Sequence, residues 1–237
     1  MGLLVTLLYR ARALRPYLGF KGLKVPVTGA HVTRPVWKHL WKGDYEAPEI
    51  LALQNLVRDG DVILEMGSGM GVVSAVASRL AENVHIEAYE ANPTLIERIK
   101  DLHQINKIDN ITVHNAILLP TSDETSRHLN LHENFTESSI VEGINSQSSV
   151  EVPVKDFRQV LQDVKPTVFM CDIEGGEEEL FQGIDLSGIR AVILELHPKV
   201  ISRAAIKAIY DTCARAGLYP RIEWSTEQVV AFERVEG

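Results

Sequence analysis

The sequence predicts an α/β fold: a central, mostly parallel sheet of seven strands with helices on both faces. Two observations carry this prediction. From residue 46 onward, short apolar runs of strand length alternate with segments of helical spacing, which is the pattern of parallel strands joined by helical crossovers. Near the end of the chain, two apolar runs follow each other with no helix between them, which predicts a closing antiparallel pair.

The helices are expected where apolar residues recur three and four positions apart. Pro93 sits in the first turn of one such segment, where its missing N–H costs little. Ser202 suits an N-cap, and Gly217 lies just past the end of the last helix. The expected helices cover residues 46–57, 72–81, 92–106, 157–164, 174–184 and 202–217.

The strands are expected at the short apolar runs between these helices. They cover residues 61–66, 84–90, 111–118, 167–173 and 189–196, with the closing pair at 218–224 and 228–235. Residues 121–154 interrupt the alternation, because they are rich in Ser, Asn, Glu and His. We expect short antiparallel strands or a long loop in this insert.

Composition is that of a globular protein. The 237 residues are 45% hydrophobic and 24% charged. The two cysteines, Cys171 and Cys213, lie in apolar segments and form no CxxC pair, which argues against a disulfide scaffold or a zinc site. We therefore expect a cytoplasmic protein with a main domain over residues 43–237.

Residues 1–42 differ from the rest in charge. They carry eight Lys or Arg and no acid, whereas all 32 acidic residues lie beyond them. We expect a basic N-terminal helical extension that packs on the domain; the alternative is an amphipathic helix, within residues 1–22, that contacts an anionic membrane surface peripherally. The acidic main part argues against a nucleic-acid partner.

The stretch 63–71, ILEMGSGMG, places a carboxylate beside a glycine-rich turn. Such a turn lets backbone approach a ligand closely. Glu65 would repel a pyrophosphate, but it would attract a ligand that carries an ammonium and a sulfonium. S-adenosylmethionine has both of these charges and no phosphate. The alternative is that Glu65 only caps the following helix.

Glu90 ends the second strand, where a carboxylate accepts hydrogen bonds from both hydroxyls of a ribose. Enzymes that bind NAD use the same device, so Glu90 alone does not choose between cofactors, and it is otherwise a solvated strand end. Together with Glu65 and the three intervening glycines, it favours S-adenosylmethionine.

A third block, MCDIEGGEEEL at 170–180, places Asp172 at the end of the fourth strand and Glu174 at the start of a helix. With this block, and with EAYEANP, VHNAI, VEVPVKDFRQVL and ILELHP, the sequence resembles the FkbM family of S-adenosylmethionine-dependent methyltransferases over residues 43–198. It departs from the family's usual Asp-x-Gly-Ala-Asn-x-Gly in the first motif.

The resemblance implies a Rossmann-like class I methyltransferase fold and O-methylation of a hydroxyl on a sugar, a glycolipid or a polyketide-like small molecule. It places Asp172 near the transferring methyl group. The implied cofactor-binding residues are Glu65, Gly67, Ser68, Gly69, Gly71, Glu90, Ala91, Asn92, Asn115, Ala116 and Asp172. We assign acceptor recognition to the insert at 121–154, with Ser138 and Ser139 as hydrogen-bonding candidates.

Methyl transfer to a hydroxyl requires a group that takes the acceptor's proton. The predicted catalytic residues are His197, Glu174 and Asp172, with His197 as a base because histidine titrates near neutral pH. A structural histidine beside Pro198 is an equal alternative. Asp172, Glu174 and Glu195 could supply oxygens to Mg²⁺, but acids near a cationic cofactor need no metal to explain them, so we expect none.

Two other functional classes stay open. A non-catalytic S-adenosylmethionine-binding module would keep the glycine turn and lack a usable base. A methyltransferase acting on a protein or on RNA would share every cofactor residue, and the basic N-terminal segment would then be a docking surface. The sequence does not identify the acceptor, the methylated position or the oligomeric state.

Overall fold

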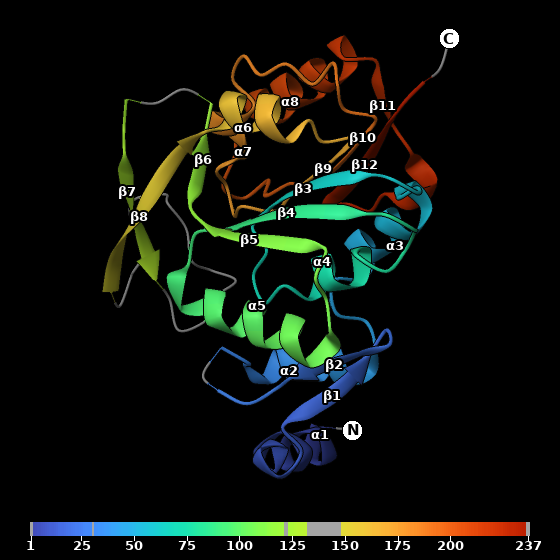
Figure 1. The fold of residues 1–237 in the computed structure, drawn as a ribbon, viewed down its shortest axis with the longest axis vertical. Coiled ribbons are helices and arrows are strands. Elements are labelled where there is room, and N and C mark those ends of the chain that lie inside the picture. Colours follow the sequence, from blue (N-terminus) through green and yellow to red (C-terminus); the bar gives the residue numbers. More distant parts are fainter. Residues whose placement is uncertain (1, 30, 121–122, 132–147, 236–237) are drawn as a thin grey trace.

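A computed structural model describes residues 2–29, 31–120, 123–131 and 148–235 (Figure 1). The strands of its central sheet are β3 (Val62–Met66), β4 (His85–Glu90), β5 (Ile111–Asn115), β9 (Val168–Cys171), β10 (Ala191–Glu195), β11 (Leu218–Pro220) and β12 (Val229–Arg234). Their order is β11-β12-β10-β9-β3-β4-β5. Strands β10, β9, β3, β4 and β5 are parallel, and β12 is antiparallel to both β10 and β11. The predicted fold class is confirmed.

Helices cover both faces of this sheet, as expected. On one face lie α3 (Ala47–Leu56), α4 (Val72–Ala77) and α5 (Pro93–Asn106); on the other lie α6 (Phe157–Val164), α7 (Glu177–Leu180) and α8 (Arg203–Arg215) (Figure 1). Side-chain caps fix where two of them begin. Asn92 accepts a hydrogen bond from the Thr94 N–H at 3.0 Å, and Ser202 accepts one from the Ala205 N–H at 3.0 Å, as predicted for Ser202.

The two faces of the sheet bury two apolar layers. Strand residues such as Ile63, Ile86 and Met170 pack towards α3, α4 and α5. Their neighbours along the strands, such as Leu64 and Phe169, pack towards α6, α7 and α8. Because successive strand residues point to opposite faces, strands that are apolar throughout are needed for a sheet covered on both sides.

The chain order of the strands reverses at β3. From β3 the chain moves outward through β4 to β5, and it then returns to place β9 on the other side of β3. In an open parallel sheet, ligands bind beyond the carboxyl ends of the strands at such a reversal. The fold therefore predicts a ligand site at the carboxyl ends of β3, β4 and β9.

The N-terminal segment is helical only in part. It contains α1 (Gly2–Arg10), a 3₁₀ turn η1 (Arg12–Leu14), strands β1 (Tyr17–Phe20) and β2 (Leu23–Pro26), and α2 (Arg34–Lys42). The prediction of a helical extension is thus wrong for residues 17–26, which form an antiparallel hairpin. Lys21 and Gly22 both adopt positive φ, at 47° and 80°, which is the turn geometry that joins two twisted strands most tightly.

Helix α1 packs on the rest of the protein through one face. Val5 is buried, the Tyr9 hydroxyl donates to the Val32 carbonyl at 2.9 Å, and the Tyr9 ring meets Trp37 edge to face. Leu7 and Leu8 stay exposed. The packed arrangement expected from the sequence is therefore present, while contact with a membrane stays a prediction.

Buried residues of this segment share one core with the main domain. Phe20 and Leu23 of the hairpin belong to the same apolar cluster as Leu53 of α3, and the Phe20 ring meets Tyr45 edge to face, with centroids 6.3 Å apart. The hairpin therefore supports the chain that leads into α3.

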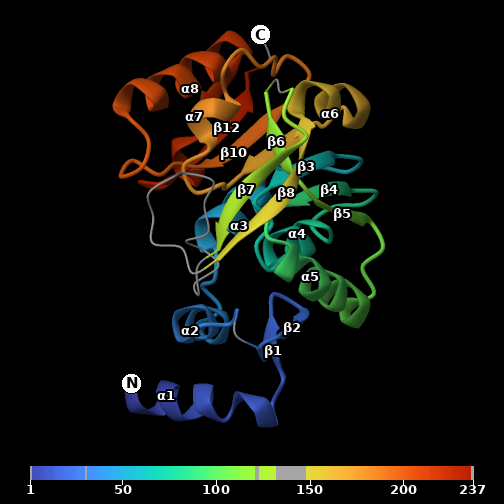
Figure 2. The ribbon, with the colours of Figure 1, turned by 90° about the vertical axis from the view of Figure 1, so that its left-hand side faces the viewer.

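The insert forms a second, small sheet beyond the carboxyl ends of the parallel strands (Figure 2). It consists of β6 (Ile117–Leu119), β8 (Ser148–Asp156) and β7 (Ser126–Leu131), with β7 and β8 antiparallel as expected. The strand expected over residues 111–118 divides at Ala116, because Ile117–Leu119 pair with β8 instead of β4. Ser138 and Ser139 lie outside the described residues.

Other elements are also shorter than expected, including the helix expected over residues 72–81, which ends at Ala77. The helix expected over residues 174–184 is limited to α7, and the strand expected over 218–224 ends at Pro220 and continues as a 3₁₀ turn, η3 (Ile222–Trp224). No helix within the described part of the chain is long and apolar enough to cross a membrane.

We expect Phe169→Ala to lower the free energy of unfolding by about 3–5 kcal/mol. Phe169 is fully buried on β9, and its ring lies between Phe157 and Phe181, with centroids 5.3 and 6.1 Å away. Truncation would leave a cavity in the core, and the hydrogen-bonded strands on either side of β9 cannot move to fill it. Urea unfolding followed by circular dichroism measures this change.

The matched control is Ile222→Ala. Ile222 is 83% exposed, so its truncation should change the unfolding free energy by no more than about 0.5 kcal/mol. Equal effects of the two substitutions would contradict the placement of Phe169 in the core.

Candidate active site

A cavity lies at the carboxyl ends of β3, β4 and β9, where the strand order reverses. Its walls come from residues 65–69, 89–91, 116–119 and 172–174, and from Tyr45, Glu46 and Glu49 at the start of α3. Leu129 of β7 closes it on the side of the insert. The position predicted for a ligand from sheet topology therefore holds a real cavity.

The glycine turn after β3 depends on the absence of side chains. Gly67 has a φ of 83°, and a Cβ atom there would lie 1.6 Å from the carbonyl oxygen of Asp172. At Gly71, φ is 72° and a Cβ atom would lie 2.9 Å from Ile99. Only glycine allows the ends of β3 and β9 to approach this closely. The turn consequently presents bare backbone to the cavity.

Glu65 lies on β3 at the wall of this cavity. It is 2% exposed, and its Oε2 atom is buried without a hydrogen-bond partner. Burial raises the pKa of Glu65, and hydrogen bonds from Ser68 and Ser74 counteract that rise. A buried carboxylate oxygen without a partner is a costly arrangement that a cationic ligand would relieve.

Glu90 ends β4 and accepts two backbone hydrogen bonds. Its Oε2 receives the Gly69 N–H at 2.7 Å, and its Oε1 receives the Asn92 N–H at 2.6 Å. Burial raises the pKa of Glu90 to about 7, against the lowering effect of these two donors. The bond to Gly69 also ties the glycine turn to the neighbouring strand.

The other predicted cofactor residues fall into two groups. Ser68, Ala91, Ala116 and Asp172 line the cavity together with Glu65, Gly67, Gly69 and Glu90. Gly71, Asn92 and Asn115 are not among its lining residues. Asn92 caps α5, and Asn115 donates to the Glu90 and Ala91 carbonyls at 2.9 Å, so both hold the cavity wall in place from behind.

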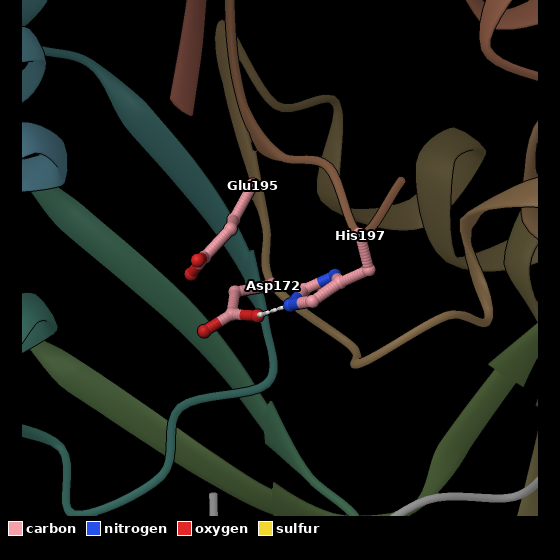
Figure 3. Close-up of side chains that lie close together, drawn as sticks. All are labelled: Asp172, Glu195 and His197. Atoms are coloured by element: carbon pink, nitrogen blue, oxygen red, sulfur yellow. Dashed lines mark ion pairs between the residues drawn. The ribbon is translucent and has the colours of Figure 1, made fainter. Parts of the chain in front are cut away.

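The three predicted catalytic residues converge at one end of the cavity. The His197 ring follows β10, and its Nε2 lies 3.7 Å from Asp172 Oδ1 and 3.1 Å from Glu174 Oε2. Glu195, at the end of β10, points towards the same place (Figure 3). The fold thus brings together predicted residues that are up to 25 positions apart in the chain.

The surroundings of His197 argue against its predicted role as the base. Its Nδ1 lies 3.0 Å from Oε1 of the fully buried Glu177, and its Nε2 faces Glu174. Burial alone would lower the pKa of His197, but Glu174 and Glu177 outweigh burial and raise that pKa to about 11. An imidazolium ring has no lone pair to accept a proton, so His197 could act as a base only after losing one, and its catalytic role stays a prediction.

Two acidic wall residues were missed from the sequence. Glu49 is 4% exposed and Glu46 lies at the N-terminal end of α3, and both face Glu195. Burial and then Glu46 raise the pKa of Glu49 to about 8. In the sequence they are ordinary acids at a helix start, and only the packing of α3 against β10 brings them to the cavity.

Comparisons with known proteins find methyltransferases. No family model matches the chain. A ribosomal protein L11 methyltransferase of Bacillus cereus (strain ATCC 10987 / NRS 248) is 36% identical over 62 residues. This match spans 26% of this chain and only 20% of that protein.

Solved structures with a similar arrangement are also methyltransferases. Precorrin-6y C5,15-methyltransferase from Geobacter metallireducens GS-15 has 16% identity and a TM-score of 0.46, over 80% of this chain and 88% of that one. Ribosomal protein L11 methylase from Lactobacillus delbrueckii subsp. bulgaricus has 11% identity and a TM-score of 0.48, over 81% and 80%. At these scores no statement about this chain's function follows from them.

We expect Glu90→Gln to change how stability depends on pH. The folded pKa of Glu90, about 7, lies above its ordinary value of 4.5. The folded protein then binds more protons than the unfolded chain between these values, so the contribution of Glu90 to stability is lost as pH rises through this window. The variant should therefore lose less stability than the wild type between pH 5 and pH 7, in urea unfolding of the ligand-free protein.

Glu97→Gln on α5 is the control, because the Glu97 side chain is 79% exposed. Its stability should follow the wild-type pH dependence. A Glu90→Gln protein whose pH dependence also matched the wild type would show that the carboxyl group is not held in the buried state described.

Proposed function

We infer that this protein is an S-adenosylmethionine-dependent methyltransferase. The observation that carries the inference is Glu65 Oε2, a buried carboxylate oxygen without a partner beside a glycine turn, at the reversal of a parallel sheet. A phosphate-bearing cofactor would be repelled there, whereas a nucleoside with two positive centres would be attracted. The 62-residue likeness to a methyltransferase supports the same class.

The wall residues fit the parts of this cofactor. Glu65 and the backbone of the turn at Gly67 and Gly69 would hold the cationic methionine end, and Glu90 would accept from ribose hydroxyls through the lone pairs that its two backbone donors leave free. Ala91 and Ala116 offer small apolar surface for the base. Bound S-adenosylmethionine would supply a methyl group activated by its sulfonium.

For the acceptor, we infer a hydroxyl group. Glu174 lines the cavity with a side chain that is 33% exposed, and it would take the hydroxyl proton as the methyl group is transferred. His197 would hold Glu174 and Asp172 in place as their cationic neighbour. The leucines of the insert, Leu119 and Leu129, would exclude water from that side of the cavity.

A second acceptor class has one observation in its favour. The curated relative is named for methylation of a ribosomal protein, and a carboxylate-lined cavity would also attract a protein's amino group. The likeness covers 20% of that relative, so its substrate is a candidate for this chain and nothing more. An RNA acceptor fits less well, because its phosphates would meet the same carboxylates.

We expect Glu65→Gln to weaken binding of S-adenosylmethionine about 10–100-fold, because one charged contact of about 1.5–3 kcal/mol is lost. Calorimetric titration measures this, with NAD⁺ as the competing ligand. The wild type should bind S-adenosylmethionine and give no heat with NAD⁺.

Glu97→Gln is again the control and should bind like the wild type, since Glu97 lies exposed on α5. If NAD⁺ bound and S-adenosylmethionine did not, the proposed function would be wrong.

Transfer of a labelled methyl group decides between the acceptor classes. Incubated with a cell extract split by size, the wild type should label the fraction of small molecules and saccharides, and Glu174→Gln should lower the rate. Label in the protein fraction instead would establish the amino-group alternative. Binding without any transfer would favour a non-catalytic binding module.

A further inference from the structure

Two carboxylates and an imidazole meet beside the cavity, whose wall includes Asp172 (Figure 3). One oxygen each of Asp172 and Glu195 and one ring nitrogen of His197 lie within 4.8 Å of one another. Glu195 also belongs to a second such group, with Glu46 and Glu49. Carboxylate oxygens and histidine nitrogens at this spacing are the donors that divalent cations use.

The negative charge of this cluster is left without basic side chains. Within the described residues, neither Lys nor Arg forms an ion pair with Glu46, Glu49, Asp172 or Glu195. His197 alone provides a positive charge close to Asp172. Like charges this close repel strongly in a partly buried site unless a cation lies between them.

Two buried oxygens in the cluster accept no hydrogen bond. Among the described residues, neither Asp172 Oδ1 nor Glu49 Oε2 accepts a hydrogen bond, although Asp172 Oδ1 lies 3.7 Å from His197 Nε2; Glu49, in the neighbouring group, is 4% exposed. Oxygens of this kind rarely persist in a folded protein without a hydrogen-bond donor or an ion. They are a second sign, independent of the spacing, that a ligand belongs here.

The His197 ring is oriented as a metal ligand would be. Its Nδ1 lies 3.0 Å from Glu177 Oε1, and Glu177 is fully buried. This leaves Nε2 facing two carboxylates, with Glu174 Oε2 3.1 Å away and Asp172 Oδ1 3.7 Å away. Histidine ligands commonly donate their other ring N–H to a carboxylate, which fixes the ring and the tautomer.

We propose that Asp172, Glu195 and His197 bind a divalent cation of the Mg²⁺ or Mn²⁺ type, with Glu177 orienting the histidine. The two carboxylates favour a hard cation, and the imidazole makes Mn²⁺ the better probe. On binding, His197 Nε2 gives its proton to solvent and offers its lone pair to the metal. The proposal replaces the metal-free interpretation that we drew from the sequence.

Such a cation would narrow the acceptor class, which rests on the proposed function. Mg²⁺ takes about six ligands, so three protein ligands leave positions for the acceptor's own oxygens. A hydroxyl bound there would lose its proton more readily, and Glu174 beside it would take that proton. The site would therefore prefer a hydroxyl with a second oxygen next to it, as in a vicinal diol.

The test is calorimetric titration of chelator-treated protein with Mn²⁺. The wild type should bind one Mn²⁺ per chain, and Glu195→Gln and His197→Gln should each bind it at least about tenfold more weakly. Glu177→Gln should weaken binding about 10–100-fold while leaving all three ligands present. Glu97→Gln, which removes an exposed carboxylate on α5, should bind as the wild type does.

Unfolding curves show whether each variant is folded. No Mn²⁺ or Mg²⁺ binding by the wild type, or equal affinity in the wild type and a folded Glu195→Gln, would overturn the proposal. Titration with S-adenosylmethionine in the presence of a chelator keeps the two proposals separate. Cofactor binding without metal binding would remove this one alone, and metal binding without cofactor binding would remove the methyltransferase alone.

Discussion

The close approach of the turn after β3 to the end of β9 is the constraint on which the site depends. A Cβ atom at position 67 would overlap the Asp172 carbonyl, so only Gly67 allows this approach. The carboxyl ends of β3 and β9 are therefore in direct contact. Glu65 and Asp172 therefore line one cavity instead of pointing from separate strands. The bond from Gly69 to Glu90 joins the third strand to the same turn. The ends of β3, β4 and β9, with Glu65, Glu90 and Asp172, are in this way held together by contacts of the turn's backbone.

This concentration of carboxylates is unfavourable for folding and useful for function. Burial raises the pKa values of Glu49, Glu65, Glu90 and Asp172 together, because each carboxylate is disfavoured in its charged form. A cationic ligand reverses that effect by restoring the charged form. Residues that cost stability in the empty protein are thus the ones that a bound cation would stabilise most.

Local patterns predicted most of the sheet, its helices and the side of the cavity formed by the glycine turn and Glu90. The glycines of the turn, Glu65 and Glu90 lie in short contiguous motifs that adjacent residues of the sequence identify, and all of them except Gly71 line the cavity. Glu46, Glu49 and the partner of His197, Glu177, could not be assigned, since helix packing alone brings them to the site. The pairing of β6 with β8 depends on which strand competes best for residues 117–119, and this competition ended the expected strand early. The hairpin at 17–26 depends on the geometry of its turn, which formed in place of the expected helix.

The N-terminal hairpin shares its core with α3, and α3 carries Glu46 and Glu49 into the cavity wall. The change of charge near residue 43 is therefore a boundary in composition, and the apolar core continues across it. A truncated or transplanted domain that started there would lose the support under Tyr45, and with it one wall of the cavity. The two parts differ in surface charge but share one interior, so they form a single folding unit.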